Sequence, residues 1–174
     1  MLIIDNELLQ QLYNAYGKEL LLYIYSLCRN WNMSEDLLQE TFVKALLSLP
    51  EQHANMRAWL YMVARNLCFN ALKKEKRQIP VDKDTMMAKY GHPDNSTEDV
   101  LENLIRQEQN HRLYHAMMKL PLIKREVLEL QYFSRLPLKE VAAILQISSE
   151  NARVISHRAK RDLRKYLEDD GYEI

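Results

Sequence analysis

Apolar residues recur at every third or fourth position along several long segments of this chain, which is the spacing of one face of an α-helix. The first segment spans Glu7–Leu27, the second Ser34–Leu49 and the third Arg57–Arg77. Only three glycines and five prolines occur among 174 residues, which is too few turn-forming residues for a many-stranded sandwich or barrel. The sequence therefore predicts an all-α protein whose first three helices form one small domain.

Residues near the ends of these segments predict helix boundaries and buried faces. Ser34 precedes two acidic residues and is expected to cap the second helix, which Pro50 ends. On the third helix, the spacing predicts a buried stripe of Trp59 or Leu60, Val63, Leu67, and Ala71 or Leu72.

A change in composition divides the chain. The helical pattern disappears between Gln78 and Glu98, where prolines, a glycine and acidic residues accumulate. We expect a three-helix domain over residues 1–78, a flexible linker over 79–97 and a four-helix domain over 98–174.

The most specific local pattern is PLKEVAAILQISSENARVISHRAKRDLRKYL, near the C-terminus. A short amphipathic segment with small Ala142 and Ala143 is followed by a three-residue connection around Ile147 and a long basic segment. Small residues let two helices cross closely, so this order predicts a helix-turn-helix whose second helix enters the DNA major groove. The expected buried stripe of that helix is Ala152, Ile155, Ala159, Leu163, and Tyr166 or Leu167.

This stripe turns a set of polar and basic side chains toward DNA. Arg153 is suited to guanine and Asn151 to adenine, whereas basic residues further along the helix are suited to phosphates. The residues predicted to contact duplex DNA are Ser149, Glu150, Asn151, Arg153, Val154, His157, Arg158 and Arg161.

The formal net charge is zero, but the charge is unevenly distributed. Residues 57–77 carry six basic residues against one acidic residue, and residues 135–166 carry eight against three. Two separate basic segments indicate two contacts with a polyanion. Two solvated helix faces would give the same pattern.

The runs SEDLLQETFVKALLSL, MRAWLYMVARNLCFNALKKEKR and LPLIKREVLELQYFSRLPLKEVAAILQIS, followed by HRAKRDLRKYL, resemble the bacterial extracytoplasmic-function sigma factors of the sigma-70 family. The resemblance covers nearly the whole chain except the linker. It implies an alternative sigma factor that binds core RNA polymerase and directs promoter-specific initiation. The first domain would capture the −10 strand and the second would read the −35 duplex. The resemblance also implies an anti-sigma factor as a partner.

The same resemblance assigns roles to particular helices. Helix 35–49 matches the segment that docks on the clamp helices of the largest polymerase subunit, with Asp36, Gln39, Glu40 and Thr41 outward beside Leu38 and Phe42. Helix 57–77 and the loop before it match the element that captures the non-template strand, where cations and aromatic platforms are needed together. The implied −10 residues are His53, Asn55, Arg57, Trp59, Tyr61, Arg65, Asn66, Asn70, Lys73 and Lys74.

The chain departs from the family pattern at two places. Gln146 stands where the family usually has glycine, at a position that favours a left-handed backbone. Ile155 is apolar and Ser156 polar, roughly the reverse of the usual order, which bears on the rotation of the recognition helix.

Signatures of other kinds of site are missing from the sequence. Cys28 and Cys68 follow no metal or redox spacing and are expected to be buried apolar residues. His111 and His115 lie four residues apart, but further zinc ligands are not evident. No nucleophile motif or phosphate loop occurs, so no cofactor, metal or enzymatic activity is expected. With no basic leader and no long apolar run, we expect a cytoplasmic protein without membrane insertion.

Two alternatives share some of these features. A conventional repressor or activator would use the helix-turn-helix alone and bind duplex DNA without polymerase. A helical interaction protein would carry basic helices only for solubility, and its affinity for DNA would not depend steeply on salt.

Overall fold

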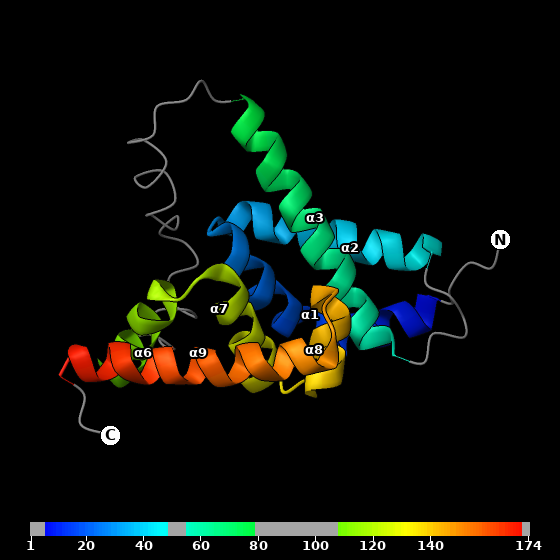
Figure 1. The fold of residues 1–174 in the computed structure, drawn as a ribbon. Coiled ribbons are helices and arrows are strands. Elements are labelled where there is room, and N and C mark those ends of the chain that lie inside the picture. Colours follow the sequence, from blue (N-terminus) through cyan, green and yellow to red (C-terminus); the bar gives the residue numbers. More distant parts are fainter. Residues whose placement is uncertain (1–5, 49–54, 79–107, 172–174) are drawn as a thin grey trace. The chain divides into compact units, whose positions relative to one another are not determined.

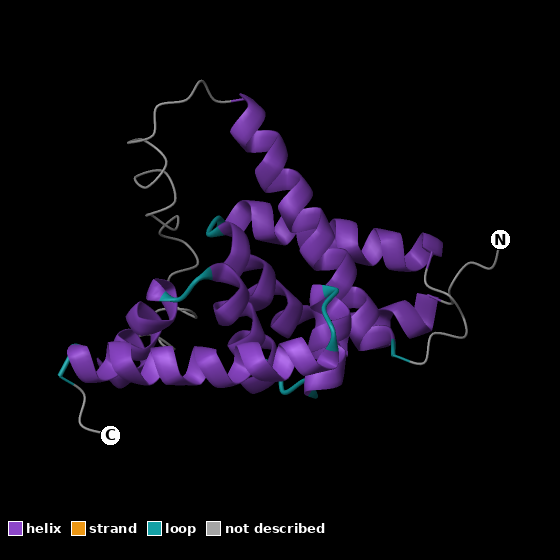
Figure 2. Ribbon diagram, in the orientation of Figure 1, coloured by secondary structure: helices purple, strands orange, loops and turns teal. Residues whose placement is uncertain are grey.

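The computed structural model describes residues 6–48, 55–78 and 108–171, and each element within these ranges is helical (Figures 1 and 2). The predicted all-α fold class is therefore confirmed. The chain divides into two compact units, Met1–Asp94 and Asn95–Ile174. The expected linker over 79–97 and the start of the following helix lie outside the described residues.

The first unit contains three long helices, each of which packs against the other two. These are α1 (Asn6–Cys28), α2 (Trp31–Ser48) and α3 (Met56–Gln78). Their shared core includes Leu20, Ile24, Leu60 and Tyr61, each 0% exposed. The Tyr61 ring lies against Tyr23 of α1, with 5.1 Å between ring centroids.

Helix α2 begins at Trp31, earlier than the sequence predicted. Arg29 adopts a left-handed backbone with φ 58°, and Asn30 caps α2 by accepting a hydrogen bond from the Met33 amide at 3.0 Å. The prediction that Ser34 caps this helix is wrong. Ser34 is fully buried inside α2, where its hydroxyl donates to the Asn30 carbonyl at 2.6 Å.

The buried face of α3 also differs from the prediction. Leu60 is buried as expected, but Val63 and Leu67 are only half-buried, and the rest of the buried stripe is formed by Ala58, Tyr61, Ala64 and Cys68. Since α3 packs against both α1 and α2, the small side chains of Ala58, Ala64 and Cys68 allow these helices to approach closely. Apolar periodicity on one helix does not contain this information.

The second unit contains α6 (Glu108–Lys119), α7 (Leu122–Leu128), η1 (Glu129–Phe133), α8 (Leu138–Leu145) and α9 (Ser149–Asp169). The element η1 continues α7 as a π-helical turn, in which the Ser134 amide donates to the Glu129 carbonyl at 3.0 Å. The long helix α9 packs against α6, α7 and α8 (Figure 1). One buried cluster, made of Met117, Leu120, Leu128 and Ala159, joins α6 and α7 to α9.

Candidate nucleic-acid and polymerase interfaces

The connection between α8 and α9 has the geometry of a helix-turn-helix. Gln146 ends α8 in the left-handed conformation, with φ 56° and ψ 43°, as its position predicted. The Ile147 amide donates to the Ala142 carbonyl at 3.0 Å and the Gln146 amide to the Ala143 carbonyl at 3.3 Å, which together form a Schellman motif. These bonds stabilise the turn, although a non-glycine residue in this conformation costs about 1 kcal/mol.

Helix α9 begins immediately after this turn. The Ser148 hydroxyl accepts a hydrogen bond from the Asn151 amide at 3.1 Å and so caps the helix. The first turns of α9 therefore have a fixed start relative to α8, which is what groove recognition requires of a second helix.

The buried stripe of α9 contains Ala152, Ser156 and Ala159. Sequence periodicity placed Ile155 in this stripe, and that prediction is wrong, because Ile155 is only half-buried. The physical reason is that the Ser156 hydroxyl, 2% exposed, donates to Gln131 Oε1 on η1 at 2.6 Å. A hydrogen-bonded hydroxyl can occupy a core position that an unpaired one would not tolerate.

The opposite face of α9 presents all of the predicted duplex contacts to solvent. Ser149, Glu150, Asn151, Arg153, Val154, His157, Arg158 and Arg161 are exposed. Lys160, Arg164 and Lys165 extend the exposed basic surface toward the C-terminal end of the helix. The exposed face therefore has polar side chains near the helix start, where base contacts were predicted, and cations further along, where phosphate contacts were predicted.

An ion pair joins α9 to α7. Lys124 Nζ donates to Asp162 Oδ2 at 2.5 Å, and both side chains are less than one-quarter exposed. The hydrogen bond with Lys124 lowers the pKa of Asp162, against the opposing effect of burial, and neighbouring Arg161 acts in the same direction. Asp162 therefore remains ionised, and its ion pair with Lys124 holds α9 against α7.

A polar and basic stripe follows the outer face of α3. Asn66, Asn70, Lys73 and Lys74 are exposed, and Trp59 is half-buried at the beginning of the same face. Positions three, four and seven apart share one side of a helix, so these side chains form a continuous surface. Of the other predicted −10 residues, His53 lies outside the described residues.

Two aromatic residues change the expected composition of this surface. Tyr61 is 0% exposed and belongs to the core, so the prediction that it offers a stacking platform is wrong. The half-buried ring of Phe69 was missed, although it follows Arg65 by four residues, and the Arg65 guanidinium lies 4.6 Å from its centroid. An arginine and an aromatic four apart on a helix were the signal that could have identified this pair.

The start of α3 is tied to its own unit. The Asn55 side chain accepts a hydrogen bond from the Ala58 amide at 2.9 Å and caps the helix. Arg57 is paired with Glu19 on α1, and its guanidinium lies 5.6 Å from the Tyr16 ring centroid. Burial opposes the charged form, but the hydrogen bond and charge of Glu19 outweigh it and raise the pKa of Arg57. Both predicted strand-binding residues therefore make structural contacts.

The outer face of α2 differs in part from the expected polymerase surface. Asp36, Gln39 and Glu40 are exposed as predicted. The prediction that Thr41 points outward is wrong, because it is 0% exposed and its hydroxyl donates to the Leu37 carbonyl at 2.7 Å. The other two members of the predicted set are core residues, namely Leu38 and Phe42.

Two exposed apolar residues on α2 were missed by the sequence analysis. Val43 is 52% exposed and Leu47 is 57% exposed. Positions 36, 40, 43 and 47 lie on one side of a helix, so these side chains continue the acidic surface of Asp36 and Glu40. Their spacing outside the buried stripe was a readable signal. Exposed apolar groups bordered by polar groups are typical of a protein interface.

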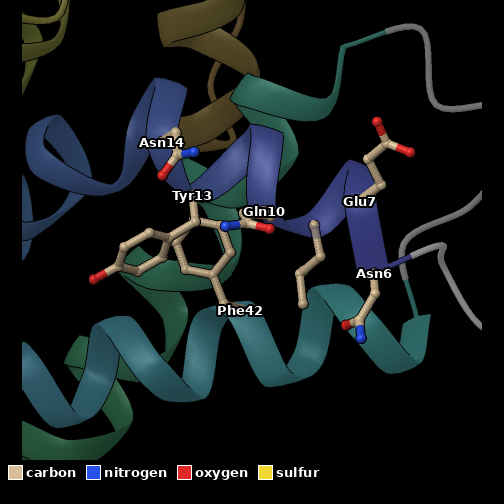
Figure 3. A pocket seen from close by; sticks show the side chains of 7 residues that line it. Asn6, Glu7, Gln10, Tyr13, Asn14 and Phe42 are labelled. Carbon is tan, nitrogen blue, oxygen red and sulfur yellow. The ribbon is translucent and has the colours of Figure 1, made fainter.

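A shallow groove lies between the first turns of α1 and the part of α2 that contains Phe42 (Figure 3). Asn6, Gln10 and Tyr13 of α1 face Phe42 of α2 there, and the Tyr13 ring meets the Phe42 ring edge-on at 5.0 Å. Glu7 is the one carboxylate in the described lining, which contains no histidine, cysteine or lysine.

The two cysteines are free thiols, and both are buried, as predicted. The hydrogen bond with Cys68 lowers the pKa of the Cys28 thiol to about 6 against the effect of burial, and Ser34 Oγ, 3.1 Å from Cys28 Sγ, acts in the same direction as Cys68. Within residues 6–48, 55–78 and 108–171, no group of three or more His, Cys, Asp or Glu residues could hold a metal ion. None of the helices described is both long and apolar enough to cross a membrane.

Comparison with known families covers both units. The family model for Sigma-70 region 2 matches residues 12–78, and that for Sigma-70, region 4 matches residues 116–165. Helices α1 to α3 thus correspond to the first match, and α7 to α9 lie within or overlap the second.

Curated relatives resemble the chain along most of its length. It is 28% identical over 157 residues to the ECF RNA polymerase sigma factor SigM of Bacillus subtilis, covering 90% of this chain and 93% of the relative. It is 26% identical to SigW of the same organism, covering 95% of this chain and 91% of the relative.

Solved structures share the fold at lower sequence identity. The sigma factor RpoE of Bartonella quintana, solved with the anti-sigma factor NepR, matches with a TM-score of 0.69 and 21% identity, covering 94% of this chain and 98% of that one. CnrH, solved with the cytosolic domain of CnrY, matches with a TM-score of 0.67 and 22% identity, covering 96% and 92%.

Proposed function

The chain belongs to the sigma-70 family of transcription factors, and on this premise we propose that it is an alternative sigma factor that binds core RNA polymerase and directs initiation at specific promoters. The observation that carries the proposal is the presence of two basic helical surfaces, one in each unit: the outer stripe of α3 and the exposed face of α9. A single-surface DNA binder would need only the second of these. The proposed role requires no catalysis by this chain.

In the first unit, we assign polymerase binding to the outer face of α2. Asp36, Gln39 and Glu40 supply a polar, acidic surface, and Val43 and Leu47 add apolar contact area beside it. An interface typically has an apolar centre surrounded by polar groups, and this face has both parts.

We assign single-strand capture to the outer stripe of α3. Asn66 and Asn70 offer hydrogen-bonding groups to bases, Lys73 and Lys74 attract phosphates, and the half-buried rings of Trp59 and Phe69 offer aromatic edges or faces. Opening a duplex costs a few kcal/mol per flipped or unstacked base, and binding the released strand offsets that cost. No nucleotide hydrolysis is required.

We assign duplex recognition to α9. The helix-turn-helix presents the first turns of α9, with Asn151 and Arg153, to the major groove, while Arg158 and Arg161 lie where phosphates pass. The two units would then bind two promoter elements, residues 1–78 the −10 strand and residues 98–174 the −35 duplex, with residues 79–97 connecting them.

An anti-sigma factor is a further proposed partner. The RpoE structure of similar fold contains an anti-sigma factor. A protein that covers α2 or α9 would block polymerase or DNA binding directly, because both functional faces are exposed. Polymerase and promoter DNA are cytoplasmic in bacteria, so we place the activity of this chain there.

Mobility-shift measurements on promoter fragments, with and without core polymerase, test the proposal. We expect specific binding only when core polymerase is present, and we expect Val43→Asp to weaken the association with core while leaving the fold intact, since Val43 is 52% exposed. Lys18→Ala, at an exposed position on α1, is the matched control. Tight, specific binding of duplex DNA by the chain alone would instead indicate a conventional repressor or activator.

A further inference from the structure

Either of two adjacent residues of α9, Ile155 or Ser156, could occupy the buried face of the helix. Apolar periodicity favours Ile155, whereas the structure buries Ser156. Burying a serine hydroxyl while an adjacent isoleucine stays half-exposed is unfavourable, unless the hydroxyl has a hydrogen-bond partner. The pairing partner is Gln131, whose Oε1 accepts the Ser156 hydrogen bond at 2.6 Å.

The neighbours of Ser156 on the buried stripe are small. Ala152 and Ala159, each 0% exposed, lie one helical turn before and after it. Methyl groups let α9 pack closely, but they have little shape with which to resist rotation of the helix about its axis. A hydrogen bond has a narrow range of distance and angle, so the bond between Ser156 and Gln131 defines the rotation of α9 more sharply than these methyl contacts do.

Gln131 itself comes from η1, the π-helical turn that follows α7. The turn is closed by the Ser134 amide bonded to the Glu129 carbonyl and by the Leu136 amide bonded to the Leu130 carbonyl, both at 3.0 Å. π-Turns are rare and often occur at functional positions. This turn delivers an amide side chain to the buried side of the helix that carries the DNA-reading residues.

We infer that the hydrogen bond between Gln131 and Ser156 determines promoter specificity without touching DNA, by setting the rotation of α9 and hence the directions of Arg153 and His157. The inference rests on the proposed function of α9 in reading the −35 duplex. An α-helix with its side chains is about 10–12 Å across, so a rotation of about 20° moves an outward side chain by about 2 Å. A displacement of this size breaks a hydrogen bond to a base edge.

The test uses the full chain with core polymerase and a promoter library randomised in the upstream element. Gln131→Met removes the acceptor at nearly constant length, and Ser156→Ala removes the donor. We expect each to change the relative preference for bases at one or more positions by about fivefold or more, the size of one lost bidentate base contact. Gln131→Glu retains an acceptor oxygen and should keep the wild-type preference.

A matched control separates specificity from stability. Val127, 0% exposed on α7, lies in the same unit, and Val127→Ala should lower the Tm without changing base preference. If Gln131→Met and Ser156→Ala lower the Tm in the same way and leave base preference unchanged, the inference is overturned. Should Ser156→Ala fail to fold, the half-buried Gln131 position decides the question. Absence of promoter-dependent initiation by the wild type would overturn the proposed function, and the inference with it.

Discussion

The Arg57 guanidinium, at the start of α3, donates two hydrogen bonds to the Glu19 carboxylate on α1, at 2.7 and 3.0 Å. The two side chains are 24% and 29% exposed, so solvent screens the pair only in part. Paired donors and acceptors of this kind give the strongest side-chain hydrogen bonds in proteins. The contact fixes where α3 begins relative to α1. It also pairs Arg57, which the family resemblance assigned to DNA binding, with a carboxylate of its own unit.

Replacing Arg57 by alanine is therefore expected to act on stability. We expect Arg57→Ala to lower the free energy of unfolding by about 1–3 kcal/mol, because the hydrogen bonds to a charged partner are lost. Urea unfolding measures this, and a double-mutant cycle with Glu19→Gln should show that the two changes are not additive. Unchanged stability together with lost strand binding would show that Arg57 acts mainly on DNA.

Lys73 and Lys74 are expected to behave differently, because both are exposed on the outer stripe of α3. Removing two phosphate contacts with Lys73→Ala and Lys74→Ala should reduce the slope of log affinity against log salt by about 1.4 for a single strand. Fluorescence of a −10 strand probe in the polymerase complex measures both the slope and strand opening. Lys18→Ala, on α1, should leave the slope unchanged. If Lys18→Ala reduced the slope as much as the double variant of Lys73 and Lys74, the outer stripe of α3 would not be the strand-binding surface.

Arg153 is expected to read bases. Arg153→Ala should remove about 1–3 kcal/mol of discrimination at one base pair of the upstream element and leave other positions unchanged. Arg164→Ala, further along the exposed face of α9, should weaken binding nearly equally on all sequences, as expected of a phosphate contact. Competition binding of the polymerase complex on single-base variants distinguishes the two patterns. A uniform loss with Arg153→Ala would reassign this residue to the backbone.

The Lys124–Asp162 pair predicts a pH dependence of stability. The pKa of Asp162 is lowered in the folded state. The stabilisation that the ionised Asp162 gives to the folded state is therefore fully present above the pKa of an unfolded aspartate, about 4. It is lost as the pH falls through the lower pKa of the folded state. Asp162→Asn should thus lower the Tm by a constant amount between about pH 5 and 8, and the difference should close in acid. A difference that persists below the folded pKa would show that charge is not its cause.

Features encoded locally were predictable from the sequence. The helix-turn-helix follows from small residues, a three-residue connection and a basic helix. The left-handed backbone at Gln146 was expected from the family resemblance, in which glycine usually stands at this position. Exposure of the eight predicted duplex contacts on α9 depends mainly on helical periodicity, and the prediction was correct for all of them.

Features that depend on distant partners were not predictable in this way. Ser156 is buried because Gln131, 25 residues earlier, accepts its hydrogen bond, and no pattern on α9 indicates that partner. Tyr61 is buried because α3 packs against Tyr23 on α1. Both partners lie on other elements, and the hydrogen bond of Ser156 removes the usual cost of burying its hydroxyl.

Run-off transcription with purified core polymerase tests the central claim most directly. Core polymerase alone should give no transcript from a promoter library in which both elements are randomised, and addition of the chain should yield transcripts from a restricted set of templates that share both an upstream and a downstream sequence. The proposed function is contradicted if the chain neither associates with core polymerase at any ionic strength nor changes which templates are transcribed.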